Sequence, residues 1–138
     1  TLSASLTSIA NAQSYGGVDQ TTPIDADNGS NGTGNPASAS VTTITDEDRI
    51  VGNLATQTAS GVTSQANQAP RTTNTGALGT ASSDDKGIID TAGSVSLQWN
   101  NITALQSWAV SLAGLRKVGG PPPAVTAAPM FMSLGVGN

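Results

Sequence analysis

The chain has 138 residues, of which 36% are hydrophobic and only 3% aromatic, and its formal net charge is −4. It contains no histidine and no cysteine, which excludes an imidazole-based catalytic triad, a disulfide framework and a thiolate metal site. Its five basic residues lack the positive footprint that phosphate binding requires, so we expect no nucleic-acid partner.

Residues 1–44 are predicted to form an extended N-terminal arm. Residues 1–15 carry leucine and isoleucine at spacings that fit a short helix and a strand about equally well. Residues 16–40 combine Gly-Gly, Asn-Gly and two prolines, which interrupt helices and strands alike. Large apolar residues are so sparse that burial does not offset the entropy of ordering the chain. We therefore expect the arm to lie against another subunit.

The segment DADNGSNG, residues 25–32, has the acidic and glycine residues of a calcium-binding loop. The EF-hand spacing fails, because Ser30 and Pro36 stand where glycine and glutamate are required. A different calcium site, using Asp25, Asp27 and backbone carbonyls, stays open beside the alternative that the segment is only a turn. We assign no metal ligand, no catalytic residue and no cofactor.

Residues 45–86 are predicted to be a weak helix followed by a polar linker. Thr45 stands at an N-cap position, and the three acidic residues after it fall in the first turn, where the helix dipole favours carboxylates. Ile50, Leu54 and other apolar residues then form a weak stripe to about residue 66, interrupted by two glycines. We expect extended chain over 67–86.

Residues 87–120 are predicted to be a small α+β anchor. The segment GSVSLQWNN alternates apolar and polar residues, as a half-buried strand does. A stronger helix is predicted over 101–117, because Ile102, Leu105 and Leu112 recur at helical spacing and Gly119 stands at the expected stop. The predicted fold class is thus mostly irregular and extended, with short strands and one or two helices.

The predicted helix has few partners within the chain, so its apolar face is expected to dock on a neighbouring subunit. After three prolines, residues 121–138 form a spacer and an apolar tail, which we also expect to dock. The alternative that the tail folds back over the helix stays open. The predicted docking residues are Ile102, Leu105, Trp108, Leu112, Leu115, Met130, Phe131 and Met132.

Two stretches, VTSQANQAPRTTNTGALGTASSDDKGIID and GSVSLQWNNITALQSW, resemble in composition the accessory virion proteins of tailed phages. The resemblance implies a non-enzymatic structural subunit of the virion, a decoration, cement or minor capsid protein. The implied partners are the major capsid protein, other structural subunits or copies of the chain itself. The alternatives are a subunit of a phage fibre and a subunit of a secreted bacterial or archaeal surface filament. No apolar run reaches the length of a membrane span.

Overall fold

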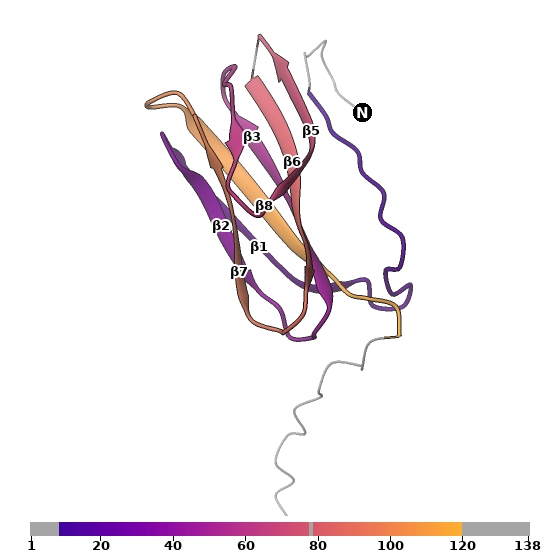
Figure 1. Ribbon diagram of the computed structural model, residues 1–138. Coiled ribbons are helices and arrows are strands. Elements are labelled where there is room, and N and C mark those ends of the chain that lie inside the picture. The colour runs from indigo at the N-terminus through magenta and orange to yellow at the C-terminus, as the bar shows by residue number, and fades with distance from the viewer. Residues whose placement is uncertain (1–8, 78, 120–138) are drawn as a thin grey trace, which may run out of the picture.

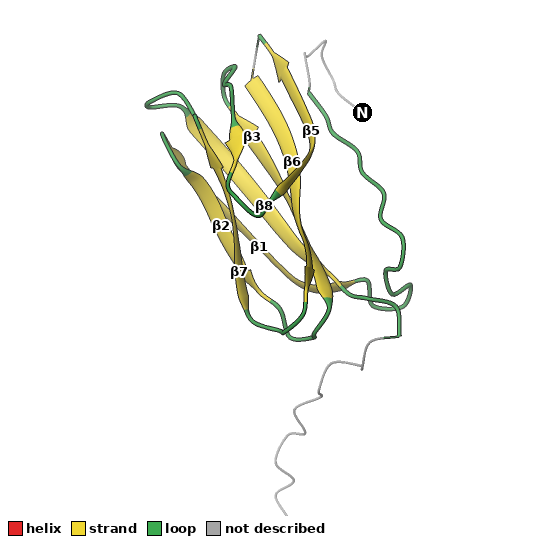
Figure 2. Cartoon of the chain, in the orientation of Figure 1, coloured by secondary structure: helices red, strands yellow, loops and turns green. Residues whose placement is uncertain are grey.

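The computed structural model describes residues 9–77 and 79–119, which form a sandwich of two antiparallel β-sheets (Figure 1). One sheet has five strands in the order β1-β8-β3-β6-β5, and the other has three in the order β2-β7-β4. The described part of the chain contains no helix (Figure 2). The strands are β1 (Ile24–Thr33), β2 (Ala37–Thr42), β3 (Asp48–Thr56), β4 (Thr63–Ser64), β5 (Ala69–Gly76), β6 (Gly79–Ile89), β7 (Ser94–Asn100) and β8 (Ser107–Leu115).

The core lies between the two sheets and is built from alternate residues of the facing strands. In β7, three buried apolar residues alternate with polar ones, so the sequence-based prediction of this strand is confirmed. In β2 the same alternation buries small residues. The buried apolar residues are Ala37, Ala39, Val41, Ile50, Leu54, Val95, Leu97, Trp99, Ile102, Val110 and Leu112.

The core needs few large residues because a glycine faces the largest of them. A Cβ atom added to Gly52 of β3 would lie 2.5 Å from the Leu112 side chain and 3.1 Å from the ring of Trp99. The missing side chain therefore lets the Trp99 indole fill the space between the sheets. The indole N–H donates a hydrogen bond of 3.0 Å to the buried Asp84 carboxylate of β6. A low apolar content is thus compatible with a packed core.

The predicted helix over 45–66 is wrong, because this segment forms β3, a connection and the short β4. Along β3, Asp48, Ile50, Gly52, Leu54 and Thr56 face inward at a period of two residues. β3 lies in the middle of its sheet and pairs with both β6 and β8, which fixes this extended conformation.

The predicted helix over 101–117 is also wrong. Residues 101–106 form a loop, and β8 then runs between β1 and β3. Leu105 is 89% exposed and has a left-handed φ of 65°, whereas Ile102 and Leu112 are buried. The spacing of apolar residues therefore reflects a loop followed by an alternating strand, and pairing with two neighbours overrides the helical pattern.

The irregular, extended fold class is contradicted, because the described part of the chain is all-β. The predicted N-terminal arm, residues 1–44, and the predicted extended chain over 67–86 contribute β1, β2, β5 and most of β6 to the two sheets. Strands from different predicted segments also pair directly, as β1 does with β8. Residues 121–138, the predicted spacer and tail, lie outside the described residues. Within the described ranges, no helix has the length and apolarity needed to cross a membrane.

Candidate functional site

The outer face of the five-stranded sheet carries the N-terminal segment 9–16, which runs beside β5 and β6 (Figure 1). The side-chain amide of Asn74 in β5 donates to the backbone oxygen of Ala10 at 3.2 Å and to the side-chain oxygen of Asn11. Farther along, Val18 forms an isolated antiparallel bridge with Lys117. The segment is therefore attached at both ends and forms one wall of a cavity.

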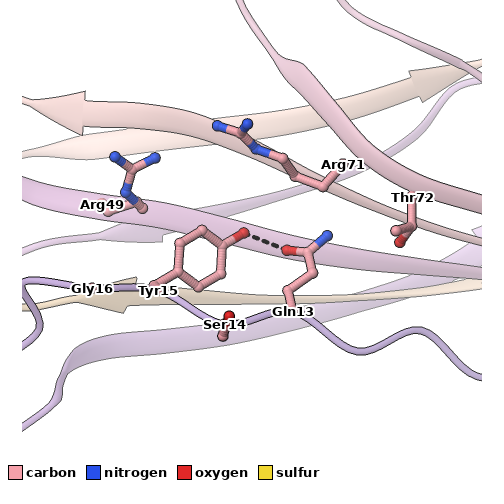
Figure 3. A pocket seen from close by; sticks show the side chains of 7 residues that line it. All are labelled: Gln13, Ser14, Tyr15, Gly16, Arg49, Arg71 and Thr72. Atoms are coloured by element: carbon pink, nitrogen blue, oxygen red, sulfur yellow. Dashed lines mark hydrogen bonds between the residues drawn. The ribbon is translucent and has the colours of Figure 1, made fainter.

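The cavity between this segment and the sheet has a volume of about 340 Å³ and opens to solvent. Figure 3 shows the side chains that line it. The floor of the cavity comes from β3 and β5. Arg49 of β3 lies on the outer face because the residues on either side of it face the core, whereas Arg71 and Thr72 are consecutive residues of β5 at its register shift. The lining is polar apart from one aromatic ring. The lining residues are Gln13, Ser14, Tyr15, Gly16, Arg49, Arg71 and Thr72.

One buried carboxylate positions the two arginines of the cavity. Arg49 and Arg71 both donate hydrogen bonds to the same oxygen of Asp85 in β6, Arg49 at 3.3 Å and Arg71 through its Nε. The other carboxylate oxygen accepts the backbone N–H of Gly87 at 2.9 Å. Burial of Asp85 opposes its ionisation, but these hydrogen bonds and the two guanidinium charges outweigh it, so its pKa lies below the ordinary value.

The aromatic ring lies directly against the arginine pair. The guanidinium carbon of Arg49 is 5.6 Å from the centroid of the Tyr15 ring, which is cation–π geometry. The Tyr15 hydroxyl donates to the side-chain oxygen of Gln13 (Figure 3). Burial and, secondarily, the nearby charge of Asp85 raise the pKa of Tyr15 above its ordinary value. Tyr15 is therefore a neutral hydrogen-bonding group at physiological pH.

Several polar atoms of the cavity have no hydrogen-bond partner among the described residues. Arg71 uses only its Nε, so its two terminal nitrogens make no hydrogen bond among the described residues. The Thr72 hydroxyl oxygen is buried and equally unpaired within the described ranges. Arg49 and Thr72 lie toward opposite ends of the cavity (Figure 3). Chemically, the arrangement is a positively charged end joined to an uncharged polar end, which suits binding of a small anion.

A second charged cluster lies buried where β1, β3 and β8 end together. Asp25, Asp48 and Arg116 are almost fully buried there, and Arg116 contacts Asp25 at 3.5 Å. The hydroxyl oxygen of Thr45, the predicted helix cap, instead lies 2.9 Å from the Asp48 carboxylate and 3.1 Å from the Asp25 carboxylate, within hydrogen-bond distance of both. This cluster holds the strand ends together, and Arg116 also borders a separate cavity of about 210 Å³ with Val18 and Lys117.

The two carboxylates of the cluster have opposite pKa shifts. The pKa of Asp48 is raised to about 6, chiefly by burial and secondarily by the neighbouring Asp25, against the hydrogen bond from Thr45. Burial also opposes ionisation of Asp25, but hydrogen bonds from the backbone of Ile44 and Thr45 outweigh it, so its pKa lies below the ordinary value. Asp48 is therefore the group of the pair that holds a proton more readily.

The predicted calcium segment forms strand β1 rather than a turn or loop. Asp25 is buried against Arg116, whereas Asp27 is exposed, so the two carboxylates do not converge. Among the described residues there is no group of three acidic, histidine or cysteine side chains that would hold a metal ion.

The structure separates the residues predicted to form one docking face. Ile102 and Leu112 belong to the core, Leu105 is exposed in the loop before β8, and Trp108 and Leu115 are partly buried near opposite ends of β8. The helix that was expected to align them is absent, and docking by the exposed members stays a prediction. Met130, Phe131 and Met132 lie outside the described residues.

Sequence reasoning missed the cavity, because its residues come from three distant parts of the chain. The one available signal is the scarcity of basic residues: two of the five in the chain, Arg49 and Arg71, share this site. They are 22 positions apart, and only the pairing of β3 and β5 with β6 brings them to the same carboxylate.

Comparison with protein-family models, with curated proteins and with solved structures found no match for this chain.

Proposed function

We propose that the chain is a non-enzymatic structural subunit of a virion, a decoration or cement protein, and that copies of it associate through the free edge of β1. The compositional resemblance to accessory virion proteins supports the virion part of this proposal. The absence of histidine and cysteine from the sequence supports a non-enzymatic role. The proposed association rests on one observation: the edge strands of the sandwich differ in how well they are protected against pairing with another strand.

Edge strands of monomeric proteins are usually protected against pairing by proline, charged side chains, bulges or short length. β5 has all of these except short length, since it contains Pro70, Arg71 and a register shift between Pro70 and Thr72. In the other sheet, β4 has only two residues, and β2 lies beside β1, where Asn28 donates to the backbone oxygen of Ser40 at 2.7 Å.

β1 contacts β2 at Asn28, but beyond that residue it has none of the other protecting features. It has ten residues, pairs among the described strands with β8 alone, and its segment 28–33 contains neither a charge nor a proline. Two copies pairing antiparallel about Ser30 would place Asp27 opposite Thr33, so no like charges would meet. The two five-stranded sheets would then form one continuous sheet across a two-fold axis.

A lysine in β1 tests this association. We expect Asn31→Lys to convert a self-associating protein into a monomer. A lysine on an edge strand disfavours pairing with another strand, and the two-fold axis would bring the lysines of the two copies close together. The measurement is sedimentation velocity over a range of concentrations. Asn53→Lys is the matched control, because Asn53 is an exposed asparagine in the central strand β3 and its replacement should leave association unchanged.

Two outcomes would contradict the proposal. A native protein that stays monomeric at all concentrations would exclude association through β1, and equal association of Asn31→Lys and native protein would place the contact elsewhere. Electron microscopy of concentrated protein distinguishes the alternative role, because a closed two-fold dimer suits a decoration subunit, whereas unlimited filaments would favour a surface filament.

A further inference from the structure

We propose that the cavity between Tyr15, Arg49 and Arg71 binds a single carboxylate-bearing sugar unit, with the carboxylate held by the two arginines. The inference is independent of the proposed association through β1. β5, which lines the cavity, and β1 are the opposite edges of the five-stranded sheet. A ligand in the cavity and a second copy at β1 would therefore occupy different surfaces.

The charge of the site favours an anion. Two guanidinium groups face one carboxylate, that of Asp85, so the cluster keeps one net positive charge in a chain whose net charge is −4. The two terminal nitrogens of Arg71 are unpaired among the described residues and form the planar fork that binds a carboxylate through two parallel hydrogen bonds. Arg71 is 44% exposed, so a ligand reaches it from solvent.

The uncharged end of the cavity matches the hydroxyl groups of a sugar. The buried Thr72 hydroxyl lacks a partner in the described part of the chain, and a ligand hydroxyl would supply one. Gln13 accepts from Tyr15 with its oxygen and keeps its amide N–H groups for a ligand. The volume of about 340 Å³ is at the small end of the range for ligand sites, which suits one sugar ring.

Titration of the full chain with sodium glucuronate, followed by amide chemical shifts, tests the site. We expect saturable shifts at Tyr15, Arg71 and Thr72, weaker binding of acetate and no saturable binding of glucose. Absence of saturation with glucuronate would overturn the proposal, as would equal binding of glucose. If acetate bound as tightly as glucuronate, the assignment of a sugar ligand would be wrong. If inorganic phosphate bound as tightly as glucuronate, the site would not be specific for a carboxylate.

Two variants test the residues. Arg71→Gln should weaken glucuronate binding by about tenfold or more, since it removes a charged double hydrogen bond. Lys86→Gln removes the same charge from a lysine that does not line the cavity and should bind like the native protein. Arg71 also forms an ion pair with Asp85, so Arg71→Gln changes the structure around Asp85 as well as the ligand site. A second variant, Thr72→Val, avoids this effect.

Thr72→Val removes only a hydroxyl that has no partner within the described ranges, so the thermal midpoint should not fall. Glucuronate binding should nevertheless weaken severalfold. Native affinity in both Arg71→Gln and Thr72→Val would overturn the proposal. Asn31→Lys should still bind glucuronate. The proposed sugar site and the proposed association through β1 are therefore tested independently of each other.

Discussion

At the scale of single residues, Asp48 shows how burial gives one carboxylate a direct effect on stability. Its pKa in the folded chain is about 6, above the value of 3.8 expected when the chain unfolds. Between these two values the folded chain binds more protons at Asp48 than the unfolded chain does. The contribution of Asp48 to stability is therefore greatest below about pH 4 and falls as the pH rises to about 6.

Asp48→Asn is expected to raise the free energy of unfolding at pH 7 by about 1–3 kcal/mol and to remove the decrease between about pH 4 and pH 6. Asparagine keeps an oxygen that accepts the Thr45 hydroxyl and carries no buried charge beside Asp25. Urea unfolding at several pH values measures both effects. Asp25 and Asp85, whose pKa values are lowered, contribute a separate loss of stability below about pH 4.

Asp27→Asn is the control for this experiment, because Asp27 is exposed and its replacement should leave the pH profile unchanged. A lower stability of Asp48→Asn at pH 7 together with an unchanged slope between pH 4 and pH 6 would show that Asp48 is not the titrating group.

At the scale of elements, the distance between β3 and β7 is set by one glycine. Gly52 in β3 faces Leu97 and Trp99 in β7, and the closest of these atoms would lie 2.6 Å from an added Cβ. A gap of that size does not accommodate a methyl group unless the sheets separate or the side chains of Leu97 and Leu112 and the indole move. Movement of the indole would also stretch its hydrogen bond to Asp84.

Gly52→Ala is expected to lower the free energy of unfolding by about 1–3 kcal/mol, the usual cost of overpacking a core. Gly61→Ala is the matched control, because nothing lies within 4 Å of a Cβ at Gly61, and its effect should stay within about 0.5 kcal/mol. Denaturant unfolding of the two variants and the native chain checks the difference. Equal stability of Gly52→Ala and native protein would mean that the sheets adjust freely.

At the scale of the whole molecule, the chain crosses repeatedly between the two sheets. β7 pairs with β2 and β4, whereas β8, the next strand in the sequence, pairs with β1 and β3 in the other sheet. Neither strand therefore finds its partners nearby in the sequence. Residues 87–120, predicted to be a small anchor, contain both strands and none of their partners.

The fragment 87–120 is accordingly expected to be unfolded on its own, while residues 9–119 fold as one unit. Circular dichroism and the dispersion of amide chemical shifts in the two fragments measure this. The short fragment cannot form either ladder of β7 or β8, so its backbone hydrogen bonds would go to water. Dispersed amide signals from the isolated fragment would instead support the predicted division.

The sequence by itself determined the strand at 94–100, because alternation of Val95, Leu97 and Trp99 with polar residues is a local signal. It also determined the absence of imidazole and thiolate chemistry, which follows from composition. Only the tertiary structure decided that segments rich in serine, threonine and glycine form strands. Their inward residues are small, as Ala37 and Ala39 are, so hydrophobicity gives little indication of the buried face.

The tertiary structure alone also decided the candidate site and the fate of the predicted helix. The apolar spacing over 101–117 fits a helix locally, but β1 and β3 supply hydrogen-bond partners on both sides of β8. Arg49 and Arg71 converge only because β6 lies between their strands and carries Asp85 to both. Pairing between distant strands fixes these positions, and one-dimensional patterns do not encode which strands will meet.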